Sequence, residues 1–95
     1  MFVFNLKKKW FDKIKSGEKT HEYRKYNDYW KKRFDKYVWY ERTECEFRLG
    51  YPKKTDKDKI IKGLIKMIYV VNGEDTDLKC KEKVFDINFE LAQGK

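Results

Sequence analysis

Cysteine, histidine and proline are scarce in this chain of 95 residues, which contains two cysteines, one histidine and one proline. Cys45 and Cys80 are far apart, and neither forms a Cys-x-x-Cys motif or lies near a cluster of histidines. These spacings do not match the usual zinc and redox motifs. We therefore expect no metal site and no cofactor, and we expect both thiols to be reduced structural residues.

Long hydrophobic runs are also missing. No apolar stretch approaches the roughly 20 residues that a helix needs to span a bilayer. The lysines Lys7, Lys8 and Lys9 follow the short apolar stretch at residues 2–6, whereas a secretory signal peptide carries its positive charges before the apolar stretch. We therefore expect a soluble, cytoplasmic protein with no membrane partner.

Positive charge is abundant but unevenly placed. The whole chain has a net charge of +8, and residues 1–37 alone carry 12 Lys or Arg against 5 Asp or Glu, which leaves them at +7. Clustered positive charge favours a polyanionic partner, because binding to phosphates releases condensed counterions. A solvated, lysine-rich surface that keeps a small protein soluble explains the same count equally well.

Aromatic residues make up 18% of the chain, which is more than a disordered sequence of this charge would carry. We expect residues 1–95 to fold as one domain. The pattern predicts a strand at residues 2–6 and a short helix marked by Trp10, Phe11 and Ile14, which ends at Gly17. A polar strand is predicted at residues 19–26, and Asn27 is a candidate N-cap for a second helix.

The second half of the chain is dominated by alternating patterns. Strands are predicted at residues 37–40 and 44–49, paired through a turn near residues 42–43, and strict alternation predicts a last strand at residues 85–91. Residues 60–71 fit both a helical stripe and an alternating pattern, and their β-branched content and the Asn72-Gly73 turn favour a strand. Five or six strands and two short helices indicate a small α+β fold with a curled sheet or closed barrel.

One segment stands out as a candidate site. Residues 17–24 fit the pattern G-x-K-x-x-E-x-R, formed by Gly17, Lys19, Glu22 and Arg24, and they follow directly on the first predicted helix. Lys19 is a point charge suited to a phosphate, and Arg24 has a planar fork suited to a phosphate or a base edge. Glu22 can accept hydrogen bonds from Arg24 or from an exocyclic amine.

This motif, with the preceding helix, resembles the signature of the ASCH domain, a branch of the PUA-like superfamily. The resemblance covers residues 3–26 closely and the later strands in outline. It implies a PUA-like β-barrel of five to six mixed strands with two short flanking helices. It also implies a cleft that binds RNA or a modified nucleotide, with Lys19, Glu22 and Arg24 gathered in it. Tyr26 comes immediately after the motif strand and beside Lys25, so we expect it at the mouth of this cleft.

The resemblance leaves the question of catalysis open. Some ASCH-like proteins cleave amides of acetylated cytidine, and in these a threonine nucleophile matches the position of Glu22. A carboxylate cannot replace that hydroxyl, so Glu22 argues against this reaction. If the protein is an enzyme, a ribonuclease or a nucleoside-modifying hydrolase, Lys19 and Glu22 are the candidate catalytic residues.

The structural alternatives are simpler. Glu22 and Arg24 lie two apart on one strand face, where they can form an ordinary salt bridge, and His21 should face away from Glu22 as a surface or half-buried residue. Aromatic residues among the positive charges could stack on bases, but helical spacing favours core roles, and Trp10 is assigned to the core. A small module whose basic face docks on an acidic protein partner is the third alternative. The aromatic candidates for stacking on bases are Tyr23, Tyr26, Tyr29, Trp30, Trp39 and Tyr40.

Overall fold

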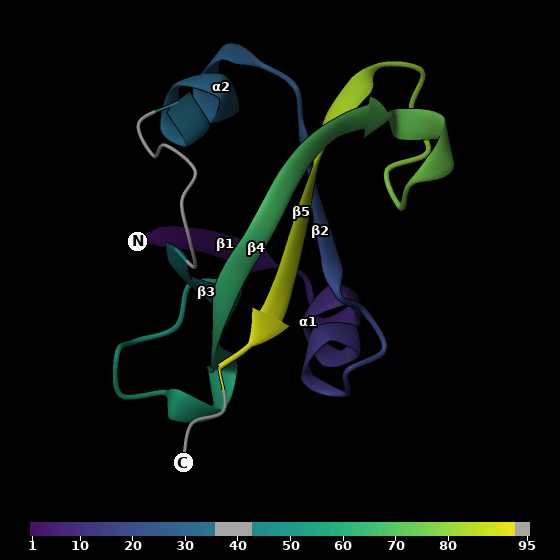
Figure 1. Cartoon of the computed structure of the whole chain (residues 1–95). Coiled ribbons are helices and arrows are strands. Elements are labelled where there is room, and N and C mark those ends of the chain that lie inside the picture. Colours follow the sequence, from purple (N-terminus) through teal and green to yellow (C-terminus); the bar gives the residue numbers. More distant parts are fainter. Residues whose placement is uncertain (36–42, 93–95) are drawn as a thin grey trace.

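The computed structural model describes residues 1–35 and 43–92, which form five strands, two α-helices and two short 3₁₀ helices (Figure 1). In chain order the elements are β1 (Phe2–Leu6), α1 (Lys8–Lys15), β2 (His21–Lys25), α2 (Asp28–Asp35), β3 (Thr43–Leu49), η1 (Lys57–Lys59), β4 (Ile60–Asn72), η2 (Gly73–Asp75) and β5 (Lys83–Leu91). The predicted small α+β fold with a curled, mixed sheet is thereby confirmed. The strand predicted at residues 37–40, its pairing with residues 44–49, and the candidates Trp39 and Tyr40 lie outside the described residues.

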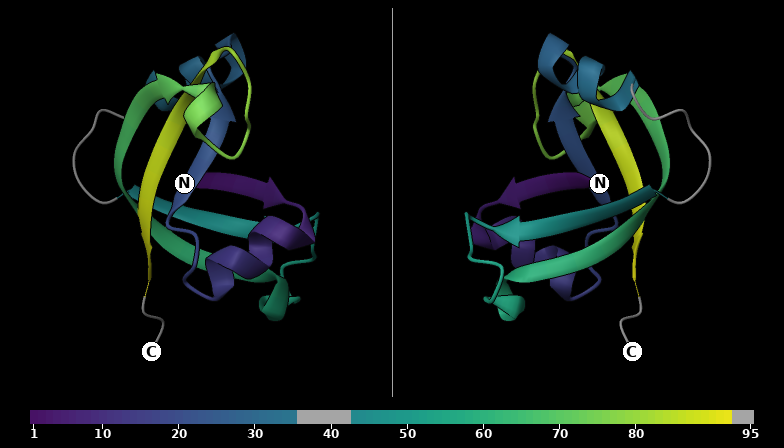
Figure 2. Two further views of the ribbon diagram at one scale, coloured as in Figure 1. Left: turned by 90° about the vertical axis from the view of Figure 1, so that its right-hand side faces the viewer. Right: turned by 90° about the vertical axis from the view of Figure 1, so that its left-hand side faces the viewer.

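The sheet has the strand order β1-β3-β4-β5-β2, so β1 and β2 are its two edges. β1 pairs with β3 in parallel, and the other neighbours are antiparallel. Figure 2 shows that the sheet curls until β1 and β3 run across the direction of β2 and β5. The curl brings the edges together, and the Arg24 guanidinium on β2 donates a hydrogen bond of 3.2 Å to the backbone carbonyl of Asn5 on β1.

The core lies inside the curl of the sheet. Inward-facing phenylalanines of three strands pack against one another there, with ring centroids 5.6 Å apart for Phe4 and Phe47 and 4.4 Å apart for Phe47 and Phe89. The helices lie at opposite ends of the curled sheet (Figure 1) and close the core with Phe11 and Phe34. The strict alternation predicted for the last strand is confirmed, because every second residue of β5 from Phe85 to Phe89 is buried.

Both helix boundaries near the motif follow the sequence signals. α1 ends before Gly17, whose φ of +86° lies in the left-handed region that glycine adopts at little cost. At the start of α2, the Asn27 side-chain carbonyl accepts a hydrogen bond of 3.0 Å from the Trp30 backbone N–H. The motif strand β2 thus lies between the glycine that ends α1 and the asparagine that caps α2.

β4 is a strand, as favoured, but its alternation does not run through its whole length. A register shift between Ile65 and Met67 marks a β-bulge. Gly63 and Ile65 are buried before the bulge, whereas Met67 and Tyr69, which continued the predicted pattern, are about half exposed after it. The bulge reverses which residues face the core, so Ile68 packs inward instead.

The chain does turn after Asn72, but it does not form the tight turn at Asn72-Gly73 that the sequence predicts. β4 ends at Asn72, which pairs with Lys83, and residues 73–82 form a longer connection that begins with η2. Gly73 is not among the glycines with positive φ, so the tight hairpin turn that favours Asn-Gly is not formed. This connection matters because it carries Asp77 and Leu78 to the cavity described below.

The two cysteines are free thiols. Cys45 is buried, and burial raises the pKa of its thiol to about 12, which makes it an unreactive structural residue. Neither α-helix in the described part of the chain has the length and apolar character needed to cross a membrane.

Candidate functional site

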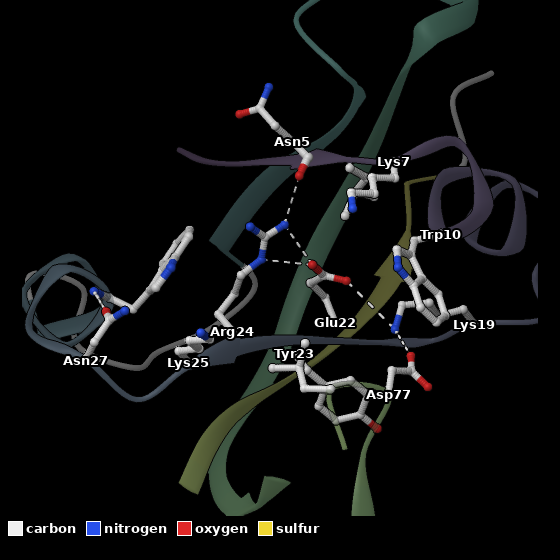
Figure 3. A pocket seen from close by; sticks show the side chains of 13 residues that line it. Asn5, Lys7, Trp10, Lys19, Glu22, Tyr23, Arg24, Lys25, Asn27 and Asp77 are labelled. Carbon is white, nitrogen blue, oxygen red and sulfur yellow. Dashed lines mark hydrogen bonds and ion pairs between the residues drawn. The ribbon is translucent and has the colours of Figure 1, made fainter. Parts of the chain in front are cut away.

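A cavity of about 350 Å³ opens between the two edge strands, β1 and β2 (Figure 3). Its volume falls in the range of roughly 300 to 1,000 Å³ that is usual for small-molecule sites. The lining comes from β1, α1, β2, α2, their adjoining loops and the connection 73–82. It consists of Asn5, Leu6, Lys7, Trp10, Lys19, Glu22, Tyr23, Arg24, Lys25, Asn27, Trp30, Asp77 and Leu78.

Three of the four predicted site residues meet in this cavity: Lys19, Glu22 and Arg24. Figure 3 shows a continuous line of polar contacts from Asn5 through Arg24, Glu22 and Lys19 to Asp77. Strand alternation explains why Glu22 and Arg24 share a face, and Lys19 lies just before β2, where the chain leaves the Gly17 cap.

Glu22 and Arg24 form a buried ion pair. The Arg24 Nε and Nη2 atoms lie 2.8 and 2.7 Å from the same carboxylate oxygen of Glu22, Oε2. Glu22 is only 5% exposed, so this contact differs from the exposed salt bridge considered for the sequence. The guanidinium also lies 5.2 Å from the Phe4 ring centroid and 5.3 Å from that of Trp30, so aromatic rings restrict its position.

Each partner of this pair keeps unused hydrogen-bonding capacity. Among residues 1–35 and 43–92 no hydrogen bond is made to Glu22 Oε1, and Lys19 Nζ lies 3.8 Å from it. Within the same residues, Nη1 of Arg24 has no acceptor. The floor of the cavity therefore offers a carboxylate oxygen at one end of the ion pair and a guanidinium nitrogen at the other (Figure 3).

Lys19, the point charge that the sequence suggests for a phosphate, already has an anionic partner in the structure. Its side chain is 8% exposed, and its ammonium group lies 5.2 Å from the Trp10 ring centroid and 4.8 Å from that of Tyr23. Nζ donates a hydrogen bond of 2.5 Å to the Asp77 carboxylate. Lys19 is therefore held in place and largely neutralised by a residue of the distant connection 73–82.

Trp10 packs against the core, as the sequence predicts, but it is only partly buried and has a second role. It also lines the cavity. Trp30 does the same from α2. The two indoles give the cavity aromatic surface. The helical spacing of these residues predicts core packing and does not show that they also line a cavity.

Tyr26 does not line the cavity. Its ring packs against Phe85, with centroids 5.0 Å apart, and Lys31 lies above it at 4.8 Å. His21 faces away from Glu22, as expected, and its Nδ1 lies 2.7 Å from an Asp86 carboxylate oxygen on β5. Neither residue contributes to the motif cluster.

Sequence reasoning missed Asn5 and Asp77. Asn5 contributes its backbone carbonyl, which any residue could supply, so no side-chain pattern marks it. Asp77 follows the motif by more than fifty residues and was not part of any pattern. No local pattern in the sequence links Asp77 to Lys19, because the contact depends on how the connection 73–82 folds.

Burial raises the pKa of the Glu22 carboxyl above its ordinary value of 4.5, although the positive charges of Arg24 and Lys19 oppose the shift. The folded state therefore holds this proton more tightly than the unfolded state. Raising the pH from about 4.5 through the raised pKa should reduce the free energy of unfolding, because ionised Glu22 is favoured more in the unfolded chain.

We expect the stability of the wild type to fall relative to that of Glu22→Gln as the pH rises through this window. Urea unfolding of both proteins at a series of pH values measures the difference, and Glu46→Gln, at the same spacing from Arg48, is the matched control. A wild type that gains stability relative to Glu22→Gln on raising the pH would show that Arg24 and Lys19 outweigh burial.

The cavity lacks the groups that several reactions require. No serine, threonine or cysteine is among its described lining residues, so it offers no such nucleophile. Among residues 1–35 and 43–92, no three His, Cys, Asp or Glu side chains are placed to hold a metal ion.

Comparison of the chain with models of known protein families, with curated proteins and with solved structures found no significant match.

Proposed function

We propose that the cavity between β1 and β2 binds a nucleotide unit, either of single-stranded RNA or of a modified nucleotide. The observation that carries the proposal is the pair at the cavity floor. Glu22 Oε1 is an available acceptor and Arg24 Nη1 an available donor, and both are held rigidly by the ion pair between them. A fixed acceptor and a fixed donor are the kinds of group that read the polar edges of unpaired bases.

The walls and the rim of the cavity support the same ligand. Trp10 and Trp30 supply aromatic surface of the kind on which unpaired bases stack. Lys7 and Lys25 line the cavity and are exposed, so their ammonium groups suit the phosphate that a bound base carries outside. Since Asp77 already pairs with Lys19, the deeper part of the cavity is close to neutral and suits a base better than a phosphate.

The motif also supports this reading. G-x-K-x-x-E-x-R resembles the ASCH signature, and we propose on that basis that the chain is a PUA-like domain. The curled sheet is compatible with this family. The proposal thus rests on the motif and the geometry of the cavity together.

Binding is better supported than catalysis or docking on an acidic protein. The candidate catalytic atoms Lys19 Nζ and Glu22 Oε1 lie 3.8 Å apart, but Lys19 donates to Asp77 and no hydroxyl or thiol of serine, threonine or cysteine lines the described cavity. Lys7, Lys8 and Lys9 are exposed and would suit an acidic partner, but exposed lysines alone do not define a site.

Calorimetric titration with the four ribonucleoside monophosphates, N4-acetylcytidine and a short single-stranded RNA tests the proposal. We expect saturable binding, and we expect Glu22→Gln and Arg24→Lys each to weaken it by about 1 to 3 kcal/mol. RNA affinity should also fall steeply as salt is raised.

Arg48→Lys is the matched control, because Arg48 pairs with Glu46 at the same spacing on β3 but does not line the cavity. It should leave the affinity unchanged. Equal losses in Arg24→Lys and Arg48→Lys, or affinity that ignores both salt and Arg24, would contradict the proposal. Release of a Lys19-dependent product during incubation would instead support the enzyme alternative.

A further inference from the structure

A second cavity of about 260 Å³ lies next to the first, on the other side of Lys19. The two cavities share four lining residues, which are Trp10, Lys19, Tyr23 and Asp77. The second one is completed by Lys13, Glu18, Thr20 and His21. A wall built around the Lys19–Asp77 contact therefore separates two hollows that lie along the same strand.

The two partners in this wall are held unequally. Lys19 is 8% exposed and lies between the Trp10 and Tyr23 rings, so it cannot easily leave. The Asp77 side chain is 40% exposed, and among the described residues Lys19 is its only side-chain partner. Asp77 is thus the exchangeable partner, and its carboxylate occupies the position on Lys19 that another anion can take.

The far side of the wall offers a flat ring and a further cation. His21 and Tyr23 stack with centroids 6.2 Å apart and planes 16° apart, and the His21 side chain is 40% exposed. Its Nδ1 faces Asp86 at 2.7 Å, which fixes the orientation of the imidazole. Lys13 is also partly exposed, and its ammonium group lies 3.7 Å from the Glu18 carboxylate and 5.4 Å from the Trp10 ring centroid.

We propose that the second cavity binds the neighbouring nucleotide of a single strand whose first base occupies the cavity between β1 and β2. The phosphodiester that joins the two nucleotides replaces Asp77 on Lys19, and the second base stacks on the exposed ring of His21. This inference rests on the proposed function. It goes further by assigning a second nucleotide site and by giving Asp77 the role of a competing anion.

The charges agree with this exchange. With Asp77 turned away, Glu22 at 3.8 Å is the remaining acid beside Lys19, and the Lys19 charge is again available to a phosphate. Lys13 adds a second positive charge on the same side. Burial raises the pKa of the Tyr23 hydroxyl, which keeps it neutral and able to donate a hydrogen bond.

The test compares an uncharged nucleoside with dinucleoside monophosphates that extend it on the 5′ or the 3′ side, using wild type, His21→Ala and Asp77→Asn. One of the two dinucleoside monophosphates should bind the wild type about tenfold more tightly than the nucleoside. His21→Ala should weaken that dinucleoside monophosphate about fivefold and leave the nucleoside within twofold. Asp77→Asn should strengthen the dinucleoside monophosphate about threefold, because the competing carboxylate is gone.

Tyr51→Ala is the control for unspecific stacking, because Tyr51 is 91% exposed and lines neither cavity. A dinucleoside monophosphate that binds no more tightly than the nucleoside, or that His21→Ala does not weaken, would overturn the second site alone. Weaker binding to Asp77→Asn would show that Asp77 contacts the ligand and does not compete with it. If neither probe binds the wild type, the proposed function fails and this inference fails with it.

Discussion

Replacing Arg24 with alanine is expected to lower the free energy of unfolding by about 3 kcal/mol. The change leaves the Glu22 carboxylate at 5% exposure without the two contacts that Arg24 makes with its Oε2 atom. Removing one partner of a buried ion pair typically costs about 3 to 5 kcal/mol. The lower end applies because the Arg24 side chain is 21% exposed, which admits some water.

Chemical unfolding of the wild type and the variant measures this loss. A double variant in which both Glu22 and Arg24 are replaced by leucine is the control, because it leaves no uncompensated buried charge. We expect the double variant to be more stable than Arg24→Ala. A loss below about 1 kcal/mol in Arg24→Ala would mean that the pair behaves like an exposed salt bridge.

Replacing Gly73 with alanine is expected to destabilise the protein by a similar amount, about 3 kcal/mol, the upper end of the usual cost of overpacking. A Cβ atom at this position would lie 2.4 Å from Cys80 Sγ, 2.5 Å from the Glu82 carbonyl oxygen and 2.8 Å from the Cys80 carbonyl oxygen. Two of these atoms belong to the backbone, so the connection 73–82 would have to move.

The Gly73 carbonyl also organises this connection. It accepts hydrogen bonds from the backbone N–H groups of Thr76 and Cys80 and from the Thr76 hydroxyl, at 3.2, 3.3 and 2.8 Å. A displaced connection should therefore also move Asp77 away from Lys19. Thermal unfolding measures the loss of stability, and the loss of the Lys19–Asp77 contact can be followed by NMR of the Lys19 ammonium group.

Gly50→Ala is the control for this substitution. Gly50 has a φ of +65°, but a Cβ there would meet no atom within 4 Å. The cost should be limited to about 1 kcal/mol of backbone strain. Equal losses in the two variants would show that packing around Gly73 contributes nothing.

The elements next to the motif could be predicted because their signals are local. The cap at Gly17, the N-cap at Asn27 and the alternation of β2 each depend on residues a few positions apart. For the same reason the sequence predicted that Glu22 and Arg24 share a strand face. The pairing of these two residues follows from the geometry of any strand.

The remaining parts of the site depend on contacts that are distant in the chain. Asp77 reaches Lys19 only because the connection after β4 is long, whereas the sequence indicated a tight turn at Asn72. The bulge between Ile65 and Met67 depends on pairing with β5 and leaves no local signal. Trp10 has the spacing of a core residue whether its outer part faces solvent or a cavity.

The most direct test of the account is an NMR titration of ¹⁵N-labelled protein with the nucleotide panel, following the indole N–H signals of Trp10 and Trp30. Both side chains line the cavity whose floor is formed by Glu22 and Arg24. We expect both signals to shift saturably with a common affinity, and we expect Glu22→Gln to weaken that affinity while Arg48→Lys leaves it unchanged. Nucleotide binding that leaves both indole signals unchanged, or no binding at millimolar nucleotide, would contradict it.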